Sequence, residues 1–300
     1  MDHARSSRNV LRALAVGALS AAVALGVAIV GVEEGSATPA QATAAAHVRA
    51  TAAAHVTSDN THHKPTIVLV HGAWADASSW NGEVDRLQRD GYVVRAIDNP
   101  LRGLTNDALE VKDFLSTIKG PIVLVAHSYG GSVITNAAAG NHNVKALVYV
   151  DAAAPNVGET TGQLSGATSA LNANPATLFD DVPFAGAPAG QTQLYLKEKF
   201  FVRHFAPDLP RRTAEQLFAT QRPAAMAAFD TPSAAAAWKT IPSWYVIGLK
   251  DQIITPQSEL FMAHRAHSHI LEVPGGSHVT LISHPVAVTD QILAAARSVH

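Results

Sequence analysis

Short, uninterrupted apolar runs rich in β-branched residues recur along the chain, and they restrict its fold more than any other feature. Such runs are typical of strands covered on both faces of a parallel sheet. Stretches with helical periodicity separate them, and this alternation predicts a doubly wound, mostly parallel α/β sheet whose functional site lies at the carboxyl ends of the strands. The expected strands are residues 66–70, 93–97, 121–125, 144–150, 244–247 and 269–273, and the expected helices are residues 79–89, 105–118, 129–139, 256–266 and 285–299.

Two of these helices have recognisable start signals. Thr105 or Asn106 is the expected N-cap of the second helix, because short polar side chains accept hydrogen bonds from the first turn. Pro285 suits the first position of the last helix, where its missing N–H costs nothing. Both signals predict where a helix begins.

Residues 155–241 interrupt the alternation. They contain no convincing strand, but they are rich in Pro, Gly and Ala and carry many aromatic side chains. A segment this long is too large for a plain loop. We expect an inserted, mainly helical cap on a domain that extends over residues 65–300.

The N-terminus has the order of a secretory signal. Arg5, Arg8 and Arg12 precede an uncharged apolar run over residues 13–32, and small residues follow at positions 37–42. This predicts a signal peptide over residues 1–42, cleaved after Ala42, and hence a secreted protein; the run Ala44-Ala45-Ala46 is nearly as good a cleavage signal. The alternative is a retained membrane anchor, because the run is long enough to cross a bilayer. Residues 43–64, rich in Ala, Thr and His, are expected to form a flexible tether.

Composition excludes several classes of function. Lys and Arg total 22 against 24 Asp and Glu, a balance that gives no positive field for nucleic acid. The chain has no cysteine, so thiolate catalysis, disulfides and zinc–thiolate sites are excluded. His264, His267 and His269 lack the helical spacing that presents two metal ligands on one face, so no metal site is expected.

The strongest motif is the sequence Val-Ala-His-Ser-Tyr-Gly-Gly at residues 125–131, where a buried strand ends and a helix begins. A sharp turn at this point would raise the hydroxyl of Ser128 above the sheet. The turn requires small residues two positions before and two positions after the serine, and Ala126 and Gly130 meet that need. A serine in such a turn is a candidate nucleophile.

A serine hydroxyl needs a base to take its proton and a carboxylate to orient that base. Asp251 follows the strand at 244–247, and His278 follows the strand at 269–273. The pair Gly275-Gly276 is expected to give the histidine loop the freedom to reach back over the sheet. Asp151, after the strand at 144–150, is the competing acid, although Asp251 is favoured.

These motifs, and the chain order Ser128, Asp251, His278, resemble the α/β-hydrolase superfamily. The resemblance covers residue 66 to the C-terminus, and it departs from the usual pattern in having Ala126 where glycine is common. It implies an oxyanion hole formed by the backbone N–H groups of Ala73 and Tyr129, with the His-Gly-Ala-Trp motif at residues 71–74 supplying Ala73. His71 is expected to order that loop rather than to transfer protons.

Within the superfamily the chain is similar to the branch with a small lid, which contains carboxylesterases, methyl esterases and hydroxynitrile lyases. The resemblance implies a serine esterase that needs no cofactor, and the aromatic cap favours small apolar or aromatic ester substrates. No nucleic-acid partner is expected, nor a membrane unless the N-terminal segment is retained, and the sequence does not indicate an oligomeric state.

Three alternatives stay open. Hydroxynitrile lyases of this branch carry polar residues where this chain has Ala73 and Val279, which favours hydrolysis over lyase chemistry. Perhydrolysis on the same triad and a non-catalytic, ligand-binding homologue are the other two.

Overall fold

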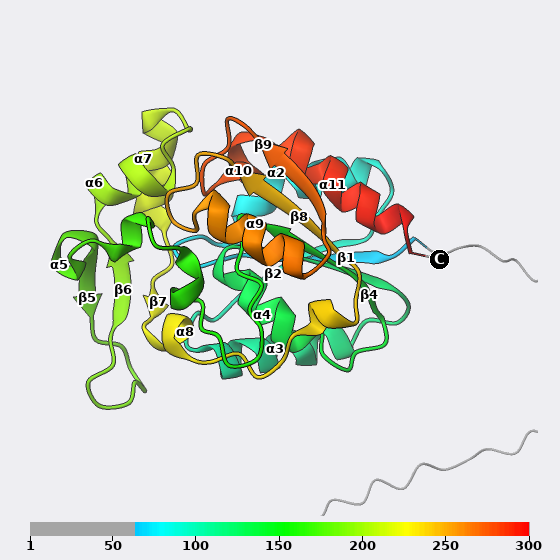
Figure 1. The fold of residues 1–300 in the computed structure, drawn as a ribbon, viewed down its shortest axis with the longest axis horizontal. Coiled ribbons are helices and arrows are strands. Elements are labelled where there is room, and N and C mark those ends of the chain that lie inside the picture. The colour runs from blue at the N-terminus through cyan, green and yellow to red at the C-terminus, as the bar shows by residue number, and fades with distance from the viewer. Residues whose placement is uncertain (1–63, 300) are drawn as a thin grey trace, which may run out of the picture. The chain divides into compact units, whose positions relative to one another are not determined.

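The computed structural model describes residues 64–299, and its centre is a six-stranded sheet in which all strand pairings are parallel (Figure 1). The strands follow the order β2-β1-β3-β4-β8-β9 across the sheet. Their bounds are β1 (Thr66–Val70), β2 (Val94–Ile97), β3 (Ile122–His127), β4 (Val144–Val150), β8 (Ser243–Gly248) and β9 (His269–Val273). Each expected strand is present, within one or two residues at its ends.

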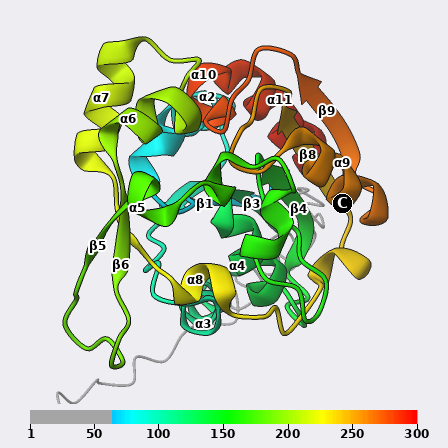
Figure 2. The same cartoon turned by 60° about the vertical axis from the view of Figure 1, so that its left-hand side comes forward.

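Helices cover both faces of this sheet, as a doubly wound fold requires. Figure 2 shows α2 and α11 on one face and α3 and α4 on the other. The helices of this layer are α2 (Asn81–Arg89), α3 (Leu104–Ser116), α4 (Tyr129–Ala137), α9 (Pro256–Arg265), α10 (Thr280–Ser283) and α11 (Pro285–Arg297). A 3₁₀ turn (Ala77–Trp80) precedes α2.

The middle of the sheet is the core of this unit. Every residue of β3 is buried, and so are β8 and almost all of β1 and β4. Tyr149 and Tyr245 stack inside it with ring centroids 5.4 Å apart. Burial on both faces explains why these strands have continuous apolar runs instead of alternating ones.

Of the two predicted helix starts, one is confirmed and one is wrong. Pro285 occupies the first turn of α11, as predicted. The N-cap predicted at Thr105 or Asn106 is wrong, because α3 begins at Leu104 after Gly103, with no side-chain cap. The carboxylate of Asp107 instead accepts hydrogen bonds from the N–H groups of Arg102 and Gly103. An acid inside the first turn thus holds the two residues that precede the helix, and no side chain caps the first-turn N–H groups.

The segment inserted between β4 and β8 lies at the carboxyl ends of the strands (Figure 1). Helical turns predominate in it: α5 (Pro175–Leu178), α6 (Glu198–Phe200), a π-helical turn (Phe201–Phe205), α7 (Arg211–Thr220), α8 (Ala227–Asp230), and 3₁₀ turns at Gly162–Ser165, Ala170–Asn172 and Ala237–Lys239. The expectation that it contains no strand is wrong, because β5 (Phe179–Val182), β6 (Gln193–Leu196) and β7 (Ala224–Ala225) form a small antiparallel sheet. These strands are two to four residues long, too short for a periodic signal.

The predicted signal peptide and the tether up to residue 63 lie outside the described residues. Between residues 64 and 299, no helix combines the length and the apolar character needed to cross a membrane.

Candidate active site

Ser128 lies in the turn between β3 and α4, with φ 54° and ψ −126°. Non-glycine residues rarely adopt this backbone conformation, which costs on the order of 1–3 kcal/mol and is found mostly at functional sites. Close packing around the turn requires glycine at position 130 of the motif and at position 72, in the loop after β1. A Cβ at Gly130 would lie 2.8 Å from the carbonyl oxygen of Val70, and a Cβ at Gly72 would lie 2.5 Å from Cβ of Ser128. The turn predicted from the motif is therefore present.

The structure brings Ser128, His278 and Asp251 together, although 150 residues separate the first two. Nε2 of His278 lies 2.8 Å from Oγ of Ser128, and its Nδ1 lies 2.6 Å from Oδ2 of Asp251. With Nδ1–H donating to the carboxylate, Nε2 is free to accept the serine proton. Burial lowers the pKa of His278, so the ring is neutral and able to act as a base.

Backbone N–H groups hold the carboxylate of Asp251. Its Oδ1 accepts hydrogen bonds from the N–H of Ile253 at 2.6 Å and of Ile254 at 3.1 Å, which leaves Oδ2 for His278. Burial raises the pKa of Asp251, and these two backbone donors oppose that effect. The strand-end loop therefore supplies an oriented acid.

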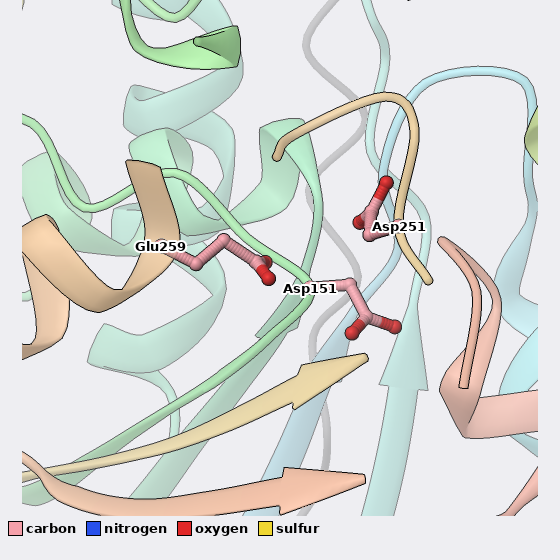
Figure 3. Close-up of side chains that lie close together, drawn as sticks. All are labelled: Asp151, Asp251 and Glu259. Carbon is pink, nitrogen blue, oxygen red and sulfur yellow. The ribbon is translucent and has the colours of Figure 1, made fainter. Parts of the chain in front are cut away.

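Asp151, the competing acid, binds Gly248 and Thr280 instead of His278. It accepts hydrogen bonds from the N–H of Gly248 at 2.8 Å and from the N–H and hydroxyl of Thr280 at 2.9 and 3.1 Å, and it has no hydrogen bond to His278. Figure 3 shows Asp251 and Asp151 beside each other, with Glu259 approaching from α9. The geometry thus gives the contact with the histidine to Asp251, and it makes Asp151 an anchor between two loops.

The loop that carries His278 is held by contacts which the sequence did not indicate. Asp208, in the cap, accepts a hydrogen bond from the N–H of Ser277 at 3.0 Å, and Nε2–H of His127 donates to the carbonyl of His278 at 2.7 Å. Neither Gly275 nor Gly276 has a positive φ. The pair therefore does not use the left-handed backbone conformations open to glycine, and its expected role in giving the loop freedom stays a prediction. A Cβ at Gly276 would lie 2.5 Å from the hydroxyl of Thr280, so close packing is the reason for glycine there.

The two expected oxyanion donors remain available. The N–H groups of Ala73 and Tyr129 donate no hydrogen bond within residues 64–299. Nδ1–H of His71 donates to the carbonyl of Gly72 at 2.8 Å, and its Nε2 accepts from the N–H of Asn99 at 3.0 Å. His71 therefore orders the loop, as predicted, and the contact between Gly72 and Ser128 keeps that loop against the nucleophile turn.

Aromatic side chains of the cap close the site. The indole of Trp74 stacks between Phe179 and Phe229, with ring centroids 5.7 and 5.2 Å away. Phe205 meets both Trp74 and the ring of His278 edge-on. Ser128 is only 4% exposed and His278 is fully buried, so the side chains that cover the serine hydroxyl close it off from solvent in this structure.

Comparison with known proteins agrees with this architecture. The sequence profile described as the alpha/beta hydrolase family matches residues 67–291. A probable hydrolase of Phoma sp. is 23% identical over 211 residues, which cover 65% of this chain and 81% of that protein.

Two solved structures illustrate the likeness in fold. A pyrethroid hydrolase from Sphingobium faniae JZ-2 superposes with a TM-score of 0.63 at 21% identity, covering 78% of this chain and 98% of that one. A methylesterase from Arabidopsis superposes with a TM-score of 0.64 at 17% identity, covering 78% of this chain and 99% of that one.

Proposed function

The chain belongs to the alpha/beta hydrolase family, and we propose that it is a serine esterase acting on small apolar or aromatic carboxylic esters. One observation carries the proposal. A continuous, buried path of hydrogen bonds runs from the hydroxyl of Ser128 through both ring nitrogens of His278 to Asp251. This is the arrangement that turns a serine hydroxyl into a nucleophile.

The reaction proceeds in two halves. In the first, Oγ of Ser128 attacks the ester carbonyl while Nε2 of His278 takes its proton, and Asp251 stabilises the imidazolium. The N–H groups of Ala73 and Tyr129 bind the oxyanion. His278 then returns the proton to the leaving alcohol, and an acyl group stays on Ser128. In the second half, water attacks the acyl-enzyme by the same route, and the carboxylic acid leaves. No cofactor takes part.

The substrate class rests on the walls of the site. Trp74, Phe179, Phe205 and Phe229 form one aromatic cluster, which reaches the site where Phe205 meets the ring of His278 and Phe229 meets Tyr129. Apolar walls with a few polar groups favour compact apolar or aromatic ligands. The neighbours in fold include proteins named a methylesterase and a pyrethroid hydrolase, and we extend esterase activity to this chain.

The test is turnover of p-nitrophenyl esters of increasing acyl length by the full chain, with Ser128→Ala and, as a matched control, the exposed Ser116→Ala. We expect Ser128→Ala alone to lose turnover, by roughly 10⁴-fold or more. Folded wild type without turnover would contradict the proposal. Aromatic cyanohydrins and peracid formation would then be assayed, because a lyase or perhydrolase could use the same three side chains.

We also propose that the enzyme is secreted, with residues 1–42 as its signal. Sequencing the N-terminus of the protein exported by an expression host tests this. A mature chain beginning at Thr43 is expected, and an uncleaved chain in the membrane fraction would contradict it.

A further inference from the structure

Three buried carboxylates from three different elements meet behind the active site. Asp151 follows β4, Asp251 follows β8 and Glu259 lies in α9, and their nearest oxygen atoms are all within 4.8 Å of one another. Asp151 and Glu259 are fully buried. Figure 3 shows the side chain of Glu259 extending from its helix toward Asp151. The catalytic scheme above uses only Asp251, so the other two need an explanation.

The hydrogen bonds of the three carboxylates differ. Asp151 and Asp251 each accept three, mostly from backbone N–H groups. Among the described residues neither oxygen of Glu259 has a partner with hydrogen-bond geometry, and the backbone N–H of Ala152 is the one donor near enough to favour its ionised form. An ionised carboxylate buried without donors costs several kcal/mol, and a group in that position takes up a proton instead.

Within residues 64–299, no cation near Glu259 offsets its charge. The guanidinium of Arg265, at the end of α9, is engaged by Glu159 and by the carbonyl of Ala154. The hydroxyl of Tyr245 donates to the carbonyl of Ala152. The charged groups facing Glu259 are therefore Asp151 and Asp251. Burial, and then these two negative charges, raise the pKa of Glu259 well above its usual range.

We propose that Glu259 is held as the neutral acid and is a positioning residue, whose proton keeps the three-carboxylate cluster at two negative charges. Burial and the charge of Asp251 raise the pKa of Asp151 as well, but the three donors on its oxygen atoms favour its ionised form, and its charge then serves as an anchor. Asp151 binds the N–H of Gly248, at the start of the loop to Asp251, and the N–H of Thr280, two residues after His278. When Glu259 loses its proton, repulsion between Glu259 and Asp151 loosens both catalytic loops.

A proton explains the cluster better than a metal ion. Hard divalent cations take about six or more oxygen ligands. Here most lone pairs of Asp151 and Asp251 already accept N–H or O–H groups, so only Glu259 has free ligand atoms. A single proton satisfies the site without displacing those donors.

The test compares wild type with Glu259→Gln, which keeps the shape of the side chain and removes the titration. A neutral acid in the folded state that ionises on unfolding makes wild type lose stability as pH rises. We expect the unfolding equilibrium constant of wild type, relative to Glu259→Gln, to grow about tenfold per pH unit from about pH 5 upward until Glu259 ionises. If the unfolding equilibrium constants of the two proteins change with pH in parallel, the proposal is overturned, even if the constants differ by a fixed factor.

Glu83→Gln is the matched control, because Glu83 is also a fully buried, unpartnered glutamate but lies in α2. If Glu259 acts on the catalytic loops, Glu259→Gln extends the reaction of Ser128 with a fluorophosphonate to higher pH, and Glu83→Gln does not. The fluorophosphonate experiment rests on the proposed function, whereas the unfolding measurement does not, so the two can fail separately. Equal alkaline profiles in wild type and Glu259→Gln would overturn the positioning role.

Infrared spectroscopy covers the case in which Glu259→Gln fails to fold. In Glu83→Gln protein labelled with ¹³C-glutamate, a protonated-carboxyl band that shifts with the label is expected at pH 8, and its absence would overturn the proposal. Calcium or magnesium that raises the melting temperature of wild type but not of Glu259→Gln would assign a metal ion instead.

Discussion

Substitution of Gly72 by alanine tests how closely the loop after β1 and the turn at Ser128 are coupled. The added Cβ would lie 2.5 Å from Cβ of Ser128 and 2.9 Å from the carbonyl oxygen of His127. Carbon atoms in contact prefer about 3.5–4.0 Å, so the loop and the turn must separate by about 1 Å. Ala73, an expected oxyanion donor, adjoins Gly72 and moves with it.

A misplacement of about 1 Å in an active site costs about 100-fold in rate, and overpacking of this kind costs about 1–3 kcal/mol in stability. We therefore expect Gly72→Ala to fold but to lose about 100-fold in p-nitrophenyl ester turnover. Gly162→Ala is the matched control, because its nearest neighbour would be 3.4 Å away and its φ is not positive. Turnover of Gly72→Ala within twofold of wild type, with normal melting, would refute this reasoning.

Two further predictions concern the buried acids. Asp251→Asn should lower kcat by about 10⁴-fold, because the amide no longer holds the tautomer of His278, while Asp151→Asn should cost far less; the reverse ranking in ester kinetics would make Asp151 the catalytic acid. Burial raises the pKa of Glu83 to about 9, so wild type should lose stability as pH rises from about 4.5 toward 9. We compare the free energies of unfolding of Glu83→Gln and wild type, measured with urea. Between pH 4 and pH 7 the difference should shift by about 3 kcal/mol in favour of Glu83→Gln.

The sequence predicted the sheet and the nucleophile turn because local features specify both. Buried parallel strands leave continuous β-branched runs, as at Thr66–Val70, and the strained turn at Ser128 requires small neighbours within two residues. Asp251 and His278 were predicted at the site because each follows an expected parallel strand, whose carboxyl ends meet at one edge of the sheet, and because their order along the chain resembles the superfamily.

Contacts between segments that are distant along the chain could not be predicted, because they leave no local signal in the sequence. Asp208 holds the histidine loop from within the cap, and nothing in its neighbourhood distinguishes it from a surface acid. Glu259 has the spacing of an ordinary helix residue, and only the folded chain places it beside Asp151. Gly276 indicated a flexible loop, and it did not indicate the close approach of Thr280, which depends on tertiary packing.

The most direct test of the central claim is to locate the nucleophile by covalent labelling. The full chain would be treated with a fluorophosphonate, digested and examined by mass spectrometry, with Ser128→Ala and Ser116→Ala alongside. We predict one adduct, on Ser128, in wild type and Ser116→Ala, and none in folded Ser128→Ala. No adduct on folded wild type, or an adduct that persists in Ser128→Ala, would contradict the assignment of Ser128 as the nucleophile.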